Sequence, residues 1–213
     1  MLFFWPGVLA QQTYRPPEVL SAGDAYAPYN IVFDGLFVLD ISIGDDGSIG
    51  RIEPLRNPGA MLDATKSAIR NWKFQPAFED RKPRPSRMTV AFVYRPGNYP
   101  TFGAVPVEDF KPVIPAAQLD DGGAEDVPVG ILSFAYPEYP INSVASGSVL
   151  LQATVDSAGD AKSVKILHGM AGFDSFAQSA LKSWRFAAAS VHGKTVTSKI
   201  VVAFIFQSPP SSN

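Results

Sequence analysis

An internal repeat is the sequence feature that most constrains the fold of this chain. Shifting the sequence by 112 residues aligns residues 19–94, here called copy 1, with residues 131–206, copy 2, without a gap. Of the 76 aligned pairs, 19 are identical. The identical pairs include turn glycines and large aromatic residues, namely Gly47 and Gly159, Trp72 and Trp184, and Phe74 and Phe186. Such a repeat predicts two copies of one supersecondary unit.

The hydropathy pattern predicts the same elements in both copies. Apolar residues alternate along a first strand, a glycine turn leads to a second strand, apolar residues then recur at helical spacing, and a last strand alternates again. These elements span 37–43, 49–55, 61–72 and 87–94 in copy 1, and 149–155, 161–167, 173–184 and 199–206 in copy 2. We therefore predict an α+β fold of two tandem β-β-α-β modules, each a three-stranded antiparallel sheet with one helix packed on one face.

Several side-chain roles follow from this pattern. Trp72, Phe74, Trp184 and Phe186 close the apolar stripe of each helix, so they are expected to belong to the structural core rather than to stack on a ligand. Asp174 is expected to cap the second helix. The outer face of the last strand of copy 2 carries Val201, Ala203 and Ile205, and we expect this apolar face to be covered by the linker, by the other module or by a partner.

The segments outside the two copies have a different composition. Residues 95–130 hold six prolines, five glycines and six carboxylates, which is typical of a linker. The apolar start of segment 1–18 is either the remnant of a secretory signal or an ordinary terminus that packs as an extra strand. Residues 207–213 form a short tail.

Composition and motifs argue against several classes of function. The formal net charge of -2 creates no global field that attracts nucleic acid, and the chain has no cysteine. The first ten residues are too short for a membrane-spanning helix, so none is expected in this chain. No nucleophile elbow, phosphate loop, dinucleotide fingerprint or recurring metal-ligand spacing is found, so we expect neither an enzyme, nor a cofactor, nor a metal site.

Three motifs resemble a known family, the TonB C-terminal domain. They are YPEYP at 136–140, GSVLLQATVDSAGDAKSVKIL at 147–167, and ALKSWRFAAA at 180–189 followed by Gly193 and Lys194. Copy 1 keeps the proline of the helix-end motif as Pro76, where copy 2 has Ala188. The resemblance covers both copies, and two copies stand where one is usual.

The resemblance implies a protein-binding function in the periplasm or cell envelope of a Gram-negative-type bacterium. Domains of this family capture an extended peptide of an outer-membrane receptor by pairing it with a sheet strand, in support of energy transduction and transmembrane transport. The partner is thus expected to be another polypeptide. The alternative is an envelope scaffolding or interaction protein that uses these modules without a transport role.

The same resemblance places the peptide site on the closing strand of each module, taken as the free edge of its sheet. The expected edge residues are Arg87, Met88, Thr89, Val90, Ala91 and Phe92 in copy 1, and Lys199, Ile200, Val201, Val202, Ala203 and Phe204 in copy 2. Four basic residues near these strands are expected to steer an acidic peptide: Arg81, Lys82, Arg84 and Lys194.

Overall fold

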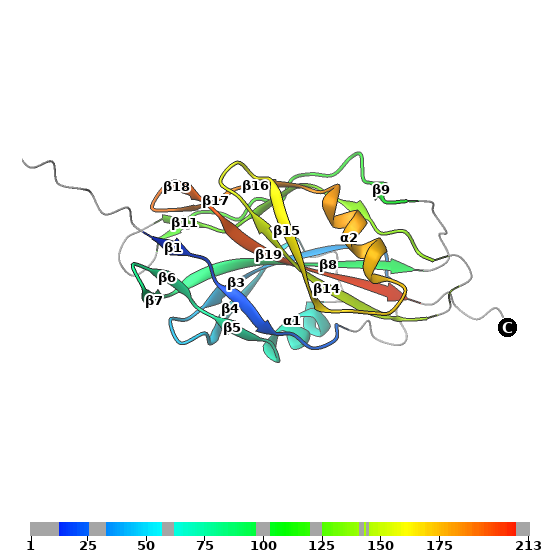
Figure 1. Ribbon diagram of the computed structural model, residues 1–213, viewed down its shortest axis with the longest axis horizontal. Helices are drawn as coiled ribbons and strands as arrows, with labels where there is room; N and C mark the ends of the chain where they lie inside the picture. Colours follow the sequence, from blue (N-terminus) through cyan, green and yellow to red (C-terminus); the bar gives the residue numbers. More distant parts are fainter. Residues whose placement is uncertain are drawn as a thin grey trace, which may run out of the picture.

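One long sheet forms the centre of the computed structural model (Figure 1). The structure describes residues 13–25, 33–56, 62–96, 103–119, 125–140, 143 and 145–207. Both the apolar start of the chain and the tail after Gln207 therefore lie outside the described residues. The six strands of the central sheet are, in spatial order, β15 (Ala161–His168), β14 (Gly147–Val155), β19 (Ser198–Gln207), β8 (Ser86–Pro96), β3 (Gly35–Ile43) and β4 (Ile49–Arg56).

The two closing strands, β8 and β19, lie side by side in the middle of this sheet. They pair in parallel from Val90 opposite Val201 to Pro96 opposite Gln207, and each also pairs antiparallel with the first strand of its own copy. The fold is α+β as expected, but the expectation of two separate three-stranded sheets is wrong. The two sheets merge because each closing strand satisfies the backbone groups that the other would leave unpaired.

The register of this central pair places the two copies on opposite faces of the sheet. Val90 lies opposite Val201, whereas its equivalent in the repeat is Val202. Successive side chains of a strand point to opposite faces, so a shift of one residue turns equivalent side chains to opposite sides. Accordingly α1 (Leu62–Arg70) packs on one face and α2 (Asp174–Lys182) on the other.

Each face carries a core shared by both copies. Under α1, Val201, Ala203 and Ile205 of copy 2 join the core of copy 1 and are at most 2% exposed. The expectation that this apolar face is covered is therefore confirmed, and the other module provides the cover. Under α2, Ala91 and Val93 of copy 1 join the core of copy 2 in the same way.

The helix-end aromatics sit in these two cores. Trp72 is 4% exposed and stacks on Phe92, with 6.0 Å between ring centroids. Trp184 is 2% exposed, and its indole N–H donates to the Ala135 carbonyl at 3.1 Å. The equivalent N–H of Trp72 has no hydrogen-bond partner within the described residues. Both copies thus bury the tryptophan at the helix end, but within the described residues only copy 2 pairs its indole N–H.

Short strands complete the layers on both faces. In copy 1, β2 (Glu18–Ser21) pairs with β5 (Lys73–Gln75), and in copy 2, β12 (Gly130–Ser133) pairs with β16 (Arg185–Ala187). The Val19 N–H of β2 donates to the Gln152 side chain of copy 2 at 3.0 Å. The Thr89 hydroxyl of copy 1 donates to the carbonyl of Val129, the residue before β12, at 2.6 Å.

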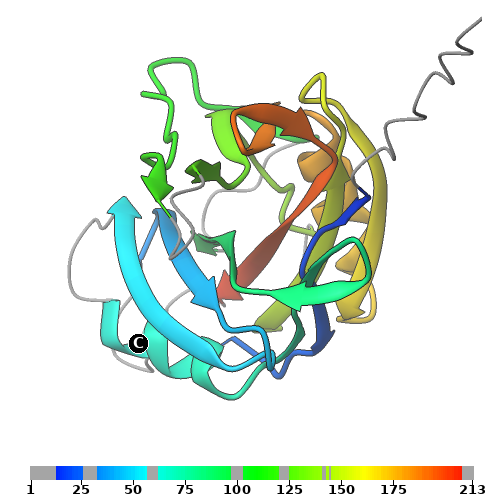
Figure 2. The ribbon, with the colours of Figure 1, turned by 90° about the vertical axis from the view of Figure 1, so that its left-hand side faces the viewer.

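A hairpin of each copy lies at the same end of the molecule (Figure 2). In copy 1 it belongs to a sheet of β1, β6 and β7, and in copy 2 to a sheet of β10, β11, β17 and β18. The strands are β1 (Tyr14–Arg15), β6 (Ala77–Glu79), β7 (Lys82–Arg84), β10 (Gln118–Leu119), β11 (Glu125–Val127), β17 (Ala189–Val191) and β18 (Lys194–Val196). Between the copies, β9 (Val105–Pro106) pairs with β13 (Ala135–Tyr136). Phe110 and Val113 also pack on the core of copy 2.

Two local features bear on the predicted elements. Gly47 and Gly159 have φ of 83° and 90°, and a Cβ on Gly47 would lie 2.3 Å from the Phe74 carbonyl oxygen, so both the turn and its close approach require glycine. Asp174 does not cap α2. The residue before it, Phe173, takes that place without a side-chain hydrogen bond, and Asp174 instead accepts from the Met170 N–H at 2.7 Å.

Candidate functional site

The strands that were expected to bind a peptide are not free edges. Both closing strands have a neighbour on each side, and of the residues that were expected to form the site, only Arg87 and Lys199 are more than slightly exposed. The expectation of a free edge is therefore wrong for all twelve residues, namely Arg87, Met88, Thr89, Val90, Ala91, Phe92, Lys199, Ile200, Val201, Val202, Ala203 and Phe204. In this arrangement a peptide cannot add to them, because their backbone donors and acceptors are already paired within the sheet.

The four residues that were expected to steer a partner divide into two groups. Arg81, Lys82 and Lys194 are exposed on the two end hairpins, where steering by them stays a prediction. Arg84 is 8% exposed, and its guanidinium contacts Asp126 at 2.8 Å and Glu79 at 3.5 Å. A buried and paired cation presents little field to an approaching peptide, so Arg84 is poorly placed for steering.

Arg84 belongs to a polar cluster that joins the two end hairpins. His192, at the tip of the copy 2 hairpin, contacts Glu79 of the copy 1 hairpin at 2.8 Å. Burial, followed by the charge of Asp126, raises the pKa of the nearby Tyr14 hydroxyl. Because the charges of this cluster are compensated internally, it is suited to holding the hairpins together rather than to acid-base chemistry.

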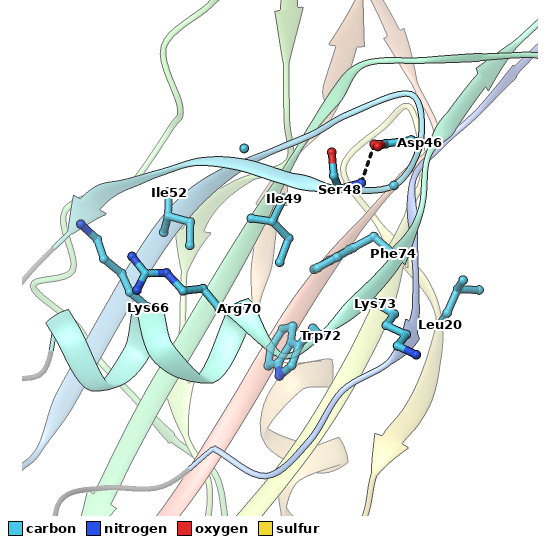
Figure 3. Close-up of a pocket in the computed structure, with 12 residues that line it drawn as sticks. Leu20, Asp46, Ser48, Ile49, Ile52, Lys66, Arg70, Trp72, Lys73 and Phe74 are labelled. Carbon is cyan, nitrogen blue, oxygen red and sulfur yellow. Dashed lines mark hydrogen bonds between the residues drawn. The ribbon is translucent and has the colours of Figure 1, made fainter.

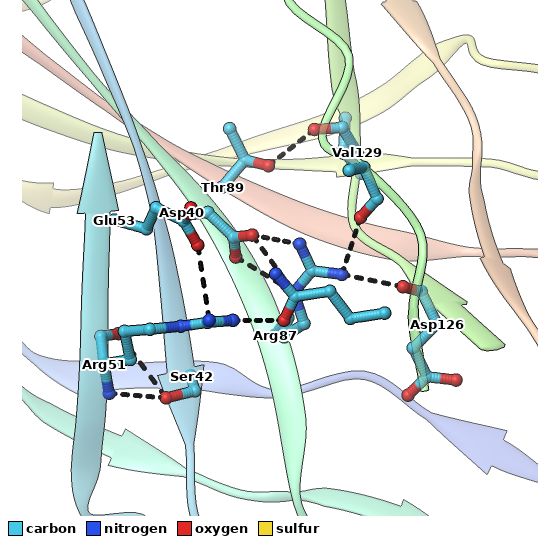
Figure 4. Close-up of polar contacts among 10 residues, drawn as sticks. Asp40, Ser42, Arg51, Glu53, Arg87, Thr89, Asp126 and Val129 are labelled. Atoms are coloured by element: carbon cyan, nitrogen blue, oxygen red, sulfur yellow. Dashed lines mark hydrogen bonds and ion pairs between the residues drawn. The ribbon is translucent and has the colours of Figure 1, made fainter. Parts of the chain in front are cut away.

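Arg87 makes a second internal network (Figure 4). Its guanidinium forms an ion pair with Asp40 of the neighbouring strand and donates to the main-chain carbonyls of Ala116 and Asp126 at 2.9 and 2.8 Å. Burial raises the pKa of the Asp40 carboxyl, and the hydrogen bonds from Arg87 oppose that rise. This network ties the segment between the copies to the face of the sheet opposite α1.

The free edges of the central sheet are its outermost strands, β4 and β15. Each is the second strand of its copy, and among the described residues each pairs on one side only, with the first strand. An edge strand presents unpaired N–H and C=O groups, which can pair with an added strand. These edges were missed by the sequence analysis.

The two edges differ in how they discourage unwanted pairing. In β4, Pro54 lacks a backbone N–H, so its half of the strand is a poor template for a further strand. In β15, Lys162 and Lys165 place charge along the whole strand. The start of β4, from Ile49 to Glu53, has neither proline nor lysine.

A groove of about 720 Å³ lies between this start of β4 and helix α1 (Figure 3). Ile49 and Ile52 point from β4 toward the helix, and Trp72 and Phe74 close the groove at the helix end. Leu20, which is 64% exposed, adds an apolar side chain at the far end. The volume falls within the range of ordinary ligand sites.

Three cations line this groove: Lys66 and Arg70 from α1, and Lys73 from β5. Among the residues that the structure describes, none of the three has an ion-pair partner. The one carboxylate that lines the groove, Asp46, accepts a hydrogen bond from the Ser48 N–H at 2.8 Å. The groove thus combines apolar side chains with a positive rim.

The equivalent place in copy 2 has a different chemistry. Ala161 and Val164 replace the two isoleucines of β4, and Gln178 replaces Lys66. Lys162, which replaces Gly50, is held by Asp156 at 3.0 Å and by Asp160 at 3.3 Å. Copy 2 therefore offers smaller apolar side chains and one cation fewer on its helix.

One comparison with known proteins gives a match. The family model described as Gram-negative bacterial TonB protein C-terminal matches residues 33–96 and 133–207, one match in each copy. No curated protein and no solved structure matches the chain. Within the described residues, no helix is long and apolar enough to cross a membrane.

Proposed function

The chain belongs to the family of Gram-negative bacterial TonB protein C-terminal domains, and on this basis we propose that it binds an extended segment of another polypeptide in the periplasm. The proposed mechanism is addition of that segment as a further strand to the central sheet. Main-chain hydrogen bonds supply affinity in this mode, and pockets for alternate side chains supply specificity.

The observation that carries this proposal is the pair of free edges, β4 and β15, on an otherwise internally paired sheet. An edge must be covered, blunted or used. The start of β4 carries neither a proline nor a charge other than Arg51 and Glu53, which lie 3.5 Å apart and pair with each other.

The proposed role is capture of receptor segments at the outer membrane in support of transport, as the family resemblance implies. A second candidate role, envelope scaffolding without transport, is favoured by one observation. The closing strands, on which receptor capture was expected, pair with each other instead. Scaffolding requires only the outer edges β4 and β15, and in this role β8 and β19 stay paired with each other.

Hydrogen exchange measured by mass spectrometry tests the proposal on the full chain. Peptides from the plug segments of outer-membrane receptors are added in excess, and strand addition is expected to slow exchange in β4 or β15. Peptides with scrambled sequence serve as the control. Slowed exchange without receptor specificity would favour scaffolding, and unchanged exchange at both edges with every peptide would refute strand addition.

A further inference from the structure

Resting on the proposed strand addition, we infer that the start of β4 together with its groove is a selective site for extended segments that alternate apolar and acidic side chains. The copy 2 edge does not share this selectivity. Neither the use of this edge nor the acidic chemistry of the partner follows from the family match.

The geometry of an added strand gives the apolar part of the selection. Side chains of a strand paired to β4 point alternately to the two faces of the sheet. Those on the α1 face lie over the groove, whose floor is formed by Ile49, Ile52 and Phe74. Alternate apolar side chains of the partner therefore bury apolar surface there, which stabilises the complex.

The rim of the groove gives the acidic part of the selection. Lys66, Arg70 and Lys73 have no ion-pair partners among the described residues, so their charges are not compensated locally. Unpaired cations around an apolar groove attract a segment that carries carboxylates beside its apolar residues. Such a rim raises the association rate more than the affinity, and this electrostatic attraction weakens at high salt.

Copy 2 provides a matched internal control for both parts. Its residues Lys182 and Arg185 are equivalent to Arg70 and Lys73, so it keeps cations at these positions. It has Ala161 where copy 1 has Ile49, and its additional cation Lys162 is neutralised by Asp156 and Asp160. The copies therefore differ in the apolar side chains of the groove and by one helix cation, Lys66 in copy 1 against Gln178 in copy 2.

The test uses fluorescence anisotropy of labelled short peptides with the full chain. The probe alternates valine with glutamate, and comparison peptides alternate valine with lysine or with serine. We expect the glutamate peptide to bind most tightly and to lose affinity at high salt. The double reversal Arg70→Glu with Lys73→Glu is expected to weaken it by about tenfold, because each rim charge contributes modestly.

The matched variant Lys182→Glu with Arg185→Glu is expected to change this affinity less than about twofold. Both pairs are on exposed positions, and melting curves check that the variants stay folded. Equal weakening by both double variants, or tighter binding of the lysine peptide, would overturn the inference. If the peptides bind and slow exchange in β15 only, the inference fails while strand addition stands. If no peptide binds, the proposed function itself fails.

Discussion

Removal of the Arg87 guanidinium gives the most demanding test of this fold. In the variant Arg87→Gln, the Asp40 carboxylate, 4% exposed in the wild type, loses its ion-pair partner. Leaving a buried charge uncompensated costs about 3 to 5 kcal/mol. The carbonyls of Ala116 and Asp126 also lose their donors, so the upper part of this range is expected.

The double variant Asp40→Asn with Arg87→Gln separates the charge from the packing. Because no buried charge remains, it is expected to be more stable than the single variant by at least about 2 kcal/mol. Lys199→Gln is the matched control in copy 2, where the partner Glu18 is half-buried and the ion pair contributes at most about 1 kcal/mol.

Urea denaturation followed by tryptophan fluorescence measures these differences, and their dependence on pH checks the cause. Burial raises the pKa of Asp40, and without Arg87 only the weaker effect of the Arg51 charge opposes that rise. A raised folded-state pKa means that the folded chain takes up a proton more readily than the unfolded chain. The cost of Arg87→Gln should therefore shrink as the pH falls from 7 toward 4. A cost below about 1 kcal/mol at pH 7, or a double variant no better than the single, would refute this account.

Three further predictions concern the buried tryptophans, the central and edge strands of copy 2, and the ion pair of Glu18. Trp184→Phe should cost about 1 to 3 kcal/mol more than Trp72→Phe in urea denaturation, since only Trp184 uses its indole N–H, and leaving the Ala135 carbonyl unpaired is costly. In the central strand, Val201→Pro and Val202→Pro should each lower stability by about 3 kcal/mol or more, whereas of Val164→Pro and Lys165→Pro on the edge strand one should be clearly milder in thermal melts. Glu18→Gln should cost at most about 1 kcal/mol at pH 7. Because the hydrogen bond from Lys199 lowers the pKa of Glu18 below 4.5, this difference should disappear as the pH falls through that lowered value.

The sequence predicted the elements within each copy because their patterns are local. Alternation and helical spacing identify which side chains share a face, and Trp72 and Trp184 lie in the core as those patterns indicate. Periodicity does not say which strand lies beside which. The merging of the two sheets depends on contacts between residues more than 100 positions apart, such as Val90 and Val201, and no local pattern reports them.

Signals for the true edges were nevertheless present. The stretches Val90–Tyr94 and Ile200–Phe206 are apolar on both faces, which is typical of a strand buried in the middle of a sheet. Pro54 interrupts the second strand of copy 1, and proline is tolerated in a sheet mainly at an edge. Together these features favour closing strands at the centre and second strands outside. The groove was not predictable in the same way, because Lys66, Arg70 and Lys73 resemble any solvated helix end until β4 is placed beside them.

The central pair of strands also sets an order of events for a chain that is made from its N-terminus. β8 is complete long before β19 exists, since Val90 and its neighbour Val201 are 111 residues apart. At the usual rate of synthesis, roughly 5 to 20 seconds pass between completion of β8 and synthesis of its neighbour β19. During that interval its apolar β8 is an open template for β8 of another nascent chain. Correct folding therefore requires that copy 1 of one nascent chain does not pair with copy 1 of another before β19 has been synthesised.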